Sequence, residues 1–398
     1  MTWRTAIGLK PTSTDLAQDL LKAAERHGLT GWQHDATADA IRNGDHVINL
    51  ANIHLEYSAA SRLGRRHLLQ KYFAMLQTPP VSKLWSLAQT KIYPLLRSRY
   101  DLLTHEIASR HKQEPFPPRA ARRFISSLDQ ILGYDHGQTV SQVPASTVEE
   151  WAVPLDVVID RALNNLRSLP APTWLKVNPS VWKLESDEGY NESFLQLPKV
   201  FEILPAKGTP VAMIPNRGAL LATGSDEPGG LTALLAEARK SLQEAAWPLC
   251  GDLFRIGSNG IQLLAPEGRD GTALDSIQKI DISSIYSAQK TALEAHCEAI
   301  QDDVYVATFG LLGQKNDPDQ LQSWCSWTEG VPTLLPKADL IAFIWDLSGA
   351  RKTALVSWKK AAATVGHYFK PTDEDPARTR VDEFPNAAEL AELQKHVV

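Results

Sequence analysis

Residues 211–238 read VAMIPNRGALLATGSDEPGGLTALLAEA, and this stretch predicts two strands followed by a helix. Two apolar runs, 210–214 and 219–223, flank the turn residues Asn216, Arg217 and Gly218, which is typical of a β-hairpin. Apolar positions at helical spacing follow over residues 231–242. Such a unit has paired strands and one apolar helix face, so it must pack against another element to be stable.

The same pattern continues outward along the chain. Residues 254–256 and 261–264 flank a Gly-Ser-Asn-Gly turn at 257–260, a hairpin signal because Asn-Gly accepts positive φ. A further hairpin is predicted from 340–345 and 353–358, with a helix continuing to about residue 365. Residues 155–166 have the apolar spacing of a helix. We predict an α+β, or mixed α/β, fold: a helical N-terminal region followed by β-hairpin–helix units around mixed sheets.

The chain divides into three predicted regions. Residues 1–135 are predicted to be mainly helical, with a helix beginning near Thr14 and others over 68–76 and 92–107. Residues 135–147 read as a linker. Residues 146–295 are predicted to form an α/β region. Residues 300–398 are predicted to form a second α/β region with Trp-rich strands, one of them over 304–312, and a C-terminal tail.

Three stretches carry a resemblance to a known family. They are NLANIHLEYSAASR (49–62), VPLDVVIDRALNNLRSLP (153–170) and residues 211–238. Over about residues 45–270 the chain resembles the YtpQ-like family of uncharacterised bacterial proteins, through an Ala-Leu-x-Asn-Leu helix core at 162–166 and a Pro-x-Arg turn between two strands. Relatives tend to carry an acidic residue after the turn arginine, where this chain has Gly218. The resemblance implies an α/β fold and no established activity.

Composition bounds the class of protein. The formal net charge is −5, with 43% hydrophobic and 22% charged residues, which is close to average globular usage and argues against a generally basic nucleic-acid protein. Three widely spaced cysteines predict no disulfide framework. No apolar run approaches the ~20 residues that span a bilayer. We expect a soluble protein of a bacterial cytoplasm with no membrane partner.

Spacing patterns typical of catalysis are missing from the sequence. There is no Gly-x-x-x-x-Gly-Lys-Ser/Thr loop, no Gly-x-Ser-x-Gly elbow and no His-Glu-x-x-His pair. We predict no catalytic residue, cofactor or metal site. The leading hypothesis is a non-catalytic binding or interaction protein with another protein as its partner. The alternative is an enzyme with a dispersed polar site, for which the side chains to inspect are Arg217, Asp226, Glu227, Glu329 and Asp339.

Residues 60–125 form a basic stretch. It holds thirteen Lys and Arg residues against three acids, a difference of +10, so the rest of the chain carries −15. Such asymmetry favours either a nucleic-acid surface or docking of the basic segment on the acidic remainder of the same chain. Arg65 and Arg99 are candidate binding residues because both continue an apolar stripe, where a buried guanidinium needs a partner. Intramolecular docking is the favoured interpretation, and nucleic-acid binding the alternative.

Two further places are candidates for binding. Asp226 and Glu227 lie where a predicted strand ends and a helix begins, a place that binds anions or caps the helix. The acids favour the cap over anion binding. Trp324 and Trp327 are an odd number of residues apart, so on a strand they face opposite sides. Trp327 is therefore a candidate contact for a partner, although burial in the core is the favoured interpretation for these rings.

Overall fold

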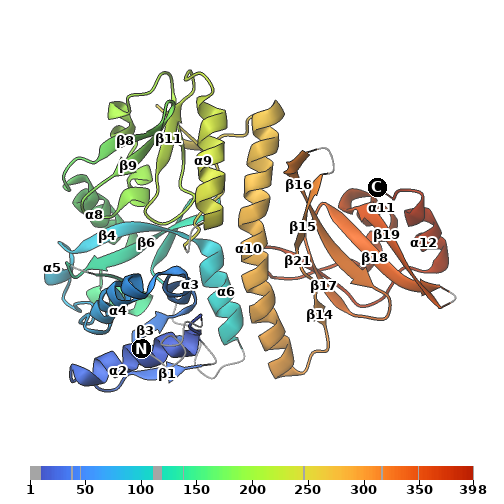
Figure 1. Cartoon of the computed structure of the whole chain (residues 1–398), viewed down its shortest axis with the longest axis horizontal. Helices are drawn as coiled ribbons and strands as arrows, with labels where there is room; N and C mark the ends of the chain where they lie inside the picture. Colours follow the sequence, from blue (N-terminus) through green and yellow to red (C-terminus); the bar gives the residue numbers. More distant parts are fainter. Residues whose placement is uncertain are drawn as a thin grey trace.

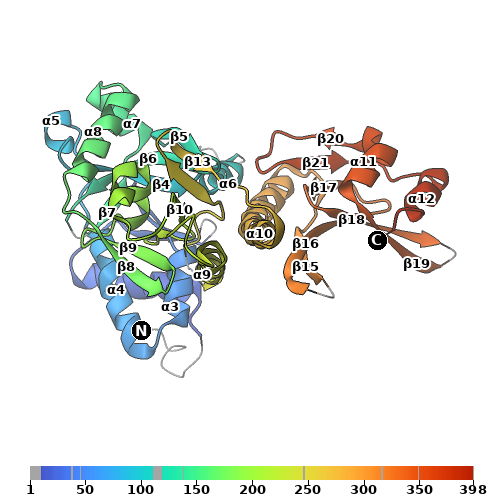
Figure 2. The same ribbon diagram turned by 90° about the horizontal axis from the view of Figure 1, so that it is seen from above.

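The computed structural model describes residues 10–36, 39–44, 46–110, 119–137, 139–244, 247–314, 317–347 and 349–397. Figure 1 shows two bodies of unequal size on either side of one long helix, α10 (Gly268–Ile300). We call residues 10–264 the main body and residues 304–397 the C-terminal lobe. Seen from above in Figure 2, α10 lies between the two bodies. In the parts of the chain just given, no helix is long and apolar enough to cross a membrane.

The main body begins with an N-terminal layer of helices on a small sheet. Helix α2 starts at a capping box, in which Thr12 accepts a hydrogen bond from the Asp15 N–H and Asp15 accepts one from the Thr12 N–H. The predicted helix near Thr14 is confirmed. The elements of this layer are α2 (Ser13–Arg26), β1 (Gln33–Asp35), β2 (Ala40–Asn43), β3 (His46–Asn49), α3 (Ala51–Ala59) and α4 (Arg62–Leu76).

Two antiparallel sheets form the centre of the main body. One has the order β4-β6-β5, with β7 also paired to β6, and the other has the order β13-β12-β10-β11-β9-β8. The strands are β4 (Ile92–Ser98), β5 (Ala121–Ile125), β6 (Leu128–Asp135), β7 (Val140–Gln142), β8 (Thr173–Asn178), β9 (Val181–Glu185), β10 (Pro210–Met213), β11 (Leu221–Gly224), β12 (Phe254–Gly257) and β13 (Gly260–Leu263). The helices are α5 (Trp85–Ala88), α6 (Arg99–Ser109), α7 (Ala145–Trp151), α8 (Leu155–Arg167), η1 (Asn191–Gln196), η2 (Pro198–Ile203) and α9 (Gly230–Glu244).

The predicted helix over 92–107 is wrong in its first half. Residues Ile92–Ser98 form strand β4, which pairs with β6 along its whole length, and the helix α6 begins only at Arg99. Ile92, Leu95 and Leu96 are all buried. A strand buried on both faces carries a near-continuous apolar run, which can be mistaken for a helix stripe.

The boundary predicted near residue 135 is also wrong. A single cluster of buried side chains runs in sequence from Ala88 to Ile256, so the core is continuous across that position. The predicted linker over 135–147 contains β7 and the start of α7. The first region therefore combines its helices with the strands β4, β5 and β6.

The hairpins and helices predicted from the middle of the chain are confirmed. Strands β10 and β11 pair as predicted, and so do β12 and β13 around the Asn259-Gly260 turn. Helices α8 and α9 occupy the predicted stretches. Helix α9 and the first half of α10 cover one face of the six-stranded sheet, through a core that includes Val211, Leu235 and Ile277. The other face of that sheet contributes to the large central core.

The C-terminal lobe contains two four-stranded sheets, with the orders β15-β16-β18-β19 and β14-β17-β21-β20. The predicted strand over 304–312 is two strands, because the chain leaves β17 after β14 and pairs with β16 as β15. The predicted hairpin of β18 and β19 is confirmed, although Ser348 of its turn lies outside the described residues. The elements are β14 (Tyr305–Val306), β15 (Gly310–Gln314), β16 (Asp317–Thr328), β17 (Thr333–Pro336), β18 (Leu340–Leu347), β19 (Ala350–Ser357), α11 (Trp358–Val365), η3 (Gly366–Tyr368), β20 (Lys370–Pro371), β21 (Arg378–Val381) and α12 (Ala387–Gln394). The fold class is α+β, as predicted.

Candidate functional site

Many cations of the basic stretch form ion pairs with acids of the same chain. Among the cations of the stretch that the structure describes, seven form ion pairs with acids of the same chain, and five of those acids lie beyond residue 149, in the main body or the C-terminal lobe. Lys112 and Glu114 of the stretch lie outside the described residues. The pairing supports intramolecular docking over a nucleic-acid surface. The pairs are Lys71–Glu56, Lys83–Glu150, Arg97–Glu192, Arg99–Asp375, Arg110–Glu374, Arg122–Asp156 and Arg123–Asp129.

Two arginines predicted as binding residues have structural contacts. Arg65 donates to the carbonyls of Tyr57 and Ser58 at 3.0 and 3.3 Å, where it satisfies carbonyl groups at the end of α3. Arg99 forms an ion pair with Asp375 of the C-terminal lobe and lies over the Tyr100 ring; its Nε is buried without an acceptor. Arg99 therefore joins the two bodies of the molecule.

Asp226, Glu227 and Trp327, the other candidate binding residues, all have contacts within the protein. Asp226 accepts a hydrogen bond from the neighbouring Ser225, whereas Glu227 accepts one from the Lys207 N–H at 2.9 Å and so ties two neighbouring loops together. Trp327 is 1% exposed and packs against four aromatic rings of the C-terminal lobe. Trp327 therefore lies in the core, which is the interpretation favoured from the sequence, and it is not a contact for a partner because it lies on the inward face of its strand.

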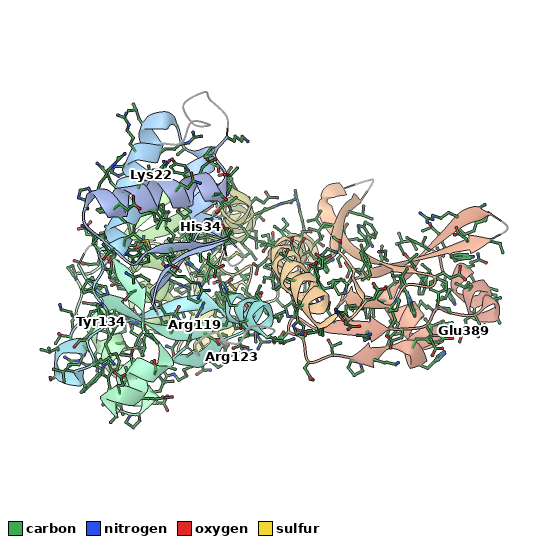
Figure 3. The ribbon with its side chains drawn as sticks, turned by 90° about the horizontal axis from the view of Figure 1, so that it is seen from below. Lys22, His34, Arg119, Arg123, Tyr134 and Glu389 are labelled. Atoms are coloured by element: carbon green, nitrogen blue, oxygen red, sulfur yellow. The ribbon has the colours of Figure 1, made fainter. Side chains whose placement is uncertain are left out.

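Arg217 lies at a different kind of place, where three separate segments bring arginines together. Arg97 is near the end of β4, Arg119 precedes β5, and Arg217 belongs to the turn between β10 and β11. We call Arg97, Arg119 and Arg217 the arginine cluster. In Figure 3, Arg119 is drawn beside α6, and repulsion between Arg119 and His105 of that helix agrees with this position. Glu389, in contrast, lies at the far end of the C-terminal lobe.

The guanidinium of Arg217 is held on one face and left partly unpaired at its edge. It lies 4.5 Å from the centre of the Trp247 ring, and its backbone N–H donates to the Trp247 carbonyl at 3.0 Å. Trp247 is itself fixed by a hydrogen bond to Glu56. Nη2 of Arg217 donates to Asp101 at 3.3 Å, whereas its Nε is buried without an acceptor. Nε and Nη2 form the edge that pairs side-on with an oxyanion, so that edge is half used.

Arg97 is fixed next to this turn by a buried carboxylate. Its Nη1 donates to Glu192 at 3.2 Å, and the second oxygen of Glu192 accepts the Gly218 N–H at 2.9 Å. Gly218 has a φ of +83°, a conformation that favours glycine. Glu192 thus holds the end of β4 against the β10–β11 turn, and the side chains of Arg97 and Arg217 stay close together.

Burial and neighbouring positive charges disfavour the charged forms of Arg119 and Arg217. Burial, followed by repulsion from Arg97, lowers the pKa of Arg217 to about 10. Burial also lowers the pKa of Arg119 to about 10, with attraction by Asp101 opposing repulsion from Arg97. Burial and the nearby Arg119 lower the pKa of His105. Perturbed groups gathered from separate segments are typical of functional sites.

An open pocket of about 350 Å³ begins at the same turn. It extends between α9 and the strands β9 and β11, and the side chain of Arg217 is 30% exposed. Solvent therefore reaches the turn from this side. The residues that line the pocket are Val177, Lys183, Asn216, Arg217, Gly218, Ala219, Leu221, Glu237 and Ser241.

The five residues predicted for a dispersed enzyme site do not meet. Asp339 forms an ion pair with Lys279 and accepts from Ser323, while Glu329 accepts from the Asp346 N–H. Within the described residues, no hydrogen bond or ion pair joins any two of the five. Nor does that part of the chain hold a group of three His, Cys, Asp or Glu side chains arranged for a metal ion.

Sequence reasoning found Arg217 and missed its neighbours. Arg97 and Arg119 are members of the basic stretch, but nothing in their spacing distinguishes them from the cations around them. Asp101 and Glu192 carry no motif either. Their grouping depends on the β4–β6 pairing and the position of the β10–β11 turn, which are long-range contacts.

Comparison of the chain with protein-family models, curated proteins and solved structures gave no match.

Proposed function

We propose that this chain is a non-catalytic binding protein that recognises an anionic group of its ligand, a carboxylate or a phosphate, at the arginine cluster. One observation carries the proposal. Three arginines from distant segments lie close together, so that Arg97 helps to lower the pKa of both Arg119 and Arg217, and Arg217 keeps a buried N–H without an acceptor. Each of these features disfavours the unliganded protein, and an oxyanion would relieve both.

The accessibility of Arg217 supports the same proposal. Its guanidinium is fixed over Trp247, so little side-chain freedom would be lost on binding, and its partly exposed side borders the open pocket. The pocket has apolar walls at Val177 and Leu221, which provide room for the uncharged part of a ligand. Binding sites often combine an apolar surface with a few fixed polar groups in this way.

Cellular location and family remain parts of this proposal. Cys250, Cys297 and Cys325 are buried free thiols, which supports a reducing cytoplasm. The resemblance of about residues 45–270 to the YtpQ-like family supports a bacterial origin. Within the proposal, another protein that offers a carboxylate or a phosphate is the partner expected.

Calorimetric titration with inorganic phosphate and, in a second arm, with acetate tests the proposal. We expect saturable phosphate binding by the full chain and a loss of at least about tenfold in affinity in Arg217→Met, because the oxyanion loses the side-on edge. Arg351→Met is the matched control, because Arg351 is an exposed arginine in the C-terminal lobe. The proposal fails if the full chain shows no saturable binding of either anion, or if the two variants lose affinity equally. Tighter binding of phosphate than of acetate identifies the group as a phosphate, and the reverse order identifies a carboxylate.

A further inference from the structure

We infer that Asp101 is an internal occupant of the anion site, and that the C-terminal lobe holds it there by clamping both ends of helix α6. The inference rests on the proposed function and adds to it the element that controls ligand access. It assigns an autoinhibitory role to an acid that has no sequence motif. The exchange it describes is non-covalent: a ligand oxyanion takes the place of the Asp101 carboxylate on Arg217.

The contact between Asp101 and Arg217 is that of a replaceable partner. Asp101 lies in the first turn of α6, and its side chain is 43% exposed. It reaches Nη2 of Arg217 at 3.3 Å, a long distance for a charged hydrogen bond, and leaves Nε without an acceptor. A free oxyanion can align with both nitrogens, whereas Asp101 is restricted by the helix that carries it. The ligand therefore gains one hydrogen bond that Asp101 does not make.

Two consecutive acids of the C-terminal lobe hold α6 at its two ends. Asp375 forms an ion pair with Arg99, the first residue of α6, and Glu374 forms one with Arg110, the residue after its last turn. The Arg110 pair is bidentate, with distances of 2.5 and 3.3 Å, and the Glu374 side chain is only 10% exposed. Partly buried pairs of this geometry restrict motion more than exposed ones.

The loop that carries these acids is itself fixed to α10. Gln289 donates to the Pro376 carbonyl, and the Tyr286 hydroxyl donates to the Ala377 carbonyl, both at 2.8 Å. Helices α6 and α10 lie side by side in Figure 1, and Ile107 packs with Leu293 in a shared apolar core. Displacement of α6 would break contacts on both its apolar and its charged side. The C-terminal lobe thereby fixes the position of Asp101 over Arg217.

A double-mutant cycle on phosphate affinity tests both parts of the inference. The variants are Asp101→Asn, the pair Glu374→Gln with Asp375→Asn, and the three substitutions together. We expect Asp101→Asn to bind phosphate about five- to tenfold more tightly than the natural chain, because the internal competitor is neutralised. The clamp pair should tighten binding by a smaller factor. The triple variant should match Asp101→Asn alone, since the clamp acts through Asp101.

Two controls separate this mechanism from general effects of charge and folding. Asp156→Asn removes an equally negative, exposed partner of another arginine, Arg122, and should leave phosphate affinity unchanged. The NMR signal of the Arg217 Nε–H group should move downfield with phosphate in Asp101→Asn, which reports binding at this atom in folded protein. Asp101→Ala, which cannot accept a hydrogen bond, should bind phosphate at least as tightly as Asp101→Asn.

The outcomes distinguish the inference from the proposed function. Absence of phosphate binding in every variant overturns both. Binding by the natural chain that Asp101→Asn does not tighten, or that Asp156→Asn tightens equally, overturns the role of Asp101 and leaves the anion site in place. A clamp effect that persists in the Asp101→Asn background overturns the role of the C-terminal lobe alone.

Discussion

Arg217 in the main body and Arg378 in the C-terminal lobe are two arginines whose pKa is lowered to about 10, with burial as the largest cause in each. Their hydrogen bonds differ. Arg378 is 2% exposed, and each of its guanidinium nitrogens donates to an oxygen, as it does to Gln289 and to three carbonyls. Arg217 has a single long contact with Asp101 and an unsatisfied Nε.

A structural arginine and an arginine available for a ligand differ in how many of their N–H donors have an acceptor. Arg378 connects α10, β17 and the chain after β14 through neutral acceptors, so its charge is solvated by the fold. Arg217 is near two like charges and reaches its acid only at the edge of the site. Burial alone does not distinguish the two residues, whereas the number of satisfied donors does.

The largest expected effect comes from replacing the satisfied arginine. Arg378→Met removes the hydrogen bonds that the guanidinium donates to the Gln289 side chain and to three carbonyls, and we expect a loss of about 3–5 kcal/mol in the free energy of unfolding. Urea denaturation followed by circular dichroism measures this quantity. Arg217→Met is the companion variant and should lose about 1 kcal/mol or less, because it removes one long hydrogen bond and one unsatisfied N–H. Equal losses in the two variants would contradict the distinction between them.

Neither arginine's environment could be read from the sequence. Arg378 follows an irregular tail rich in Pro, Asp and Glu, and its acceptors belong to residues 286–334, far away in sequence. The Asn259-Gly260 turn and the helix over Leu155–Arg167 were predictable because their signals are local. Strand β4 was misread as helix because both of its faces are buried, which removes the alternation that marks a strand.

An intermediate effect is expected from Asp281, a buried acid of helix α10. Burial raises the pKa of Asp281 to about 6, although the Gly251 N–H donates to it and repulsion from Asp252 adds to the burial effect. The folded protein thus binds this proton more tightly than the unfolded chain. The stability from the neutral carboxyl is fully present below pH 3.8 and is lost as the pH rises through about 6.

Asp281→Asn keeps an acceptor for Gly251 and removes the buried charge. We expect this variant to be more stable than the natural chain by about 2 kcal/mol at pH 7.5 and to lose that advantage near pH 4. Urea unfolding across this pH range gives the difference, and the same series on Asp156→Asn shows what the loss of one exposed carboxylate does. A difference in stability that does not change with pH would show that folding does not raise the pKa of Asp281. Burial of the Asp281 carboxylate would then cost the folded protein less free energy than the raised pKa implies.

The site as a whole was only partly predictable. The Asn216-Arg217-Gly218 turn pointed to Arg217, because a turn between two buried strands places its side chains at the end of a sheet. The partners of Arg217 are Asp101 of α6 and Trp247, which lies beyond the end of α9, and no pattern in the sequence connects them. The spacing of Trp324 and Trp327 indicates that they lie on opposite faces of β16, but not which of those faces the C-terminal lobe buries.

The smallest expected effect tests how far the anion site extends along the basic stretch. Lys83 pairs with Glu150 at 2.9 Å, but the two side chains are 77% and 42% exposed, so water screens the attraction. Lys83→Gln should change the free energy of unfolding by about 0.5 kcal/mol or less and should leave phosphate affinity unchanged. Denaturation and calorimetry on this variant measure both quantities. If phosphate affinity fell as far as in Arg217→Met, anion recognition would belong to the whole basic stretch, and the nucleic-acid interpretation of residues 60–125 would regain support over a site built on one half-used guanidinium edge.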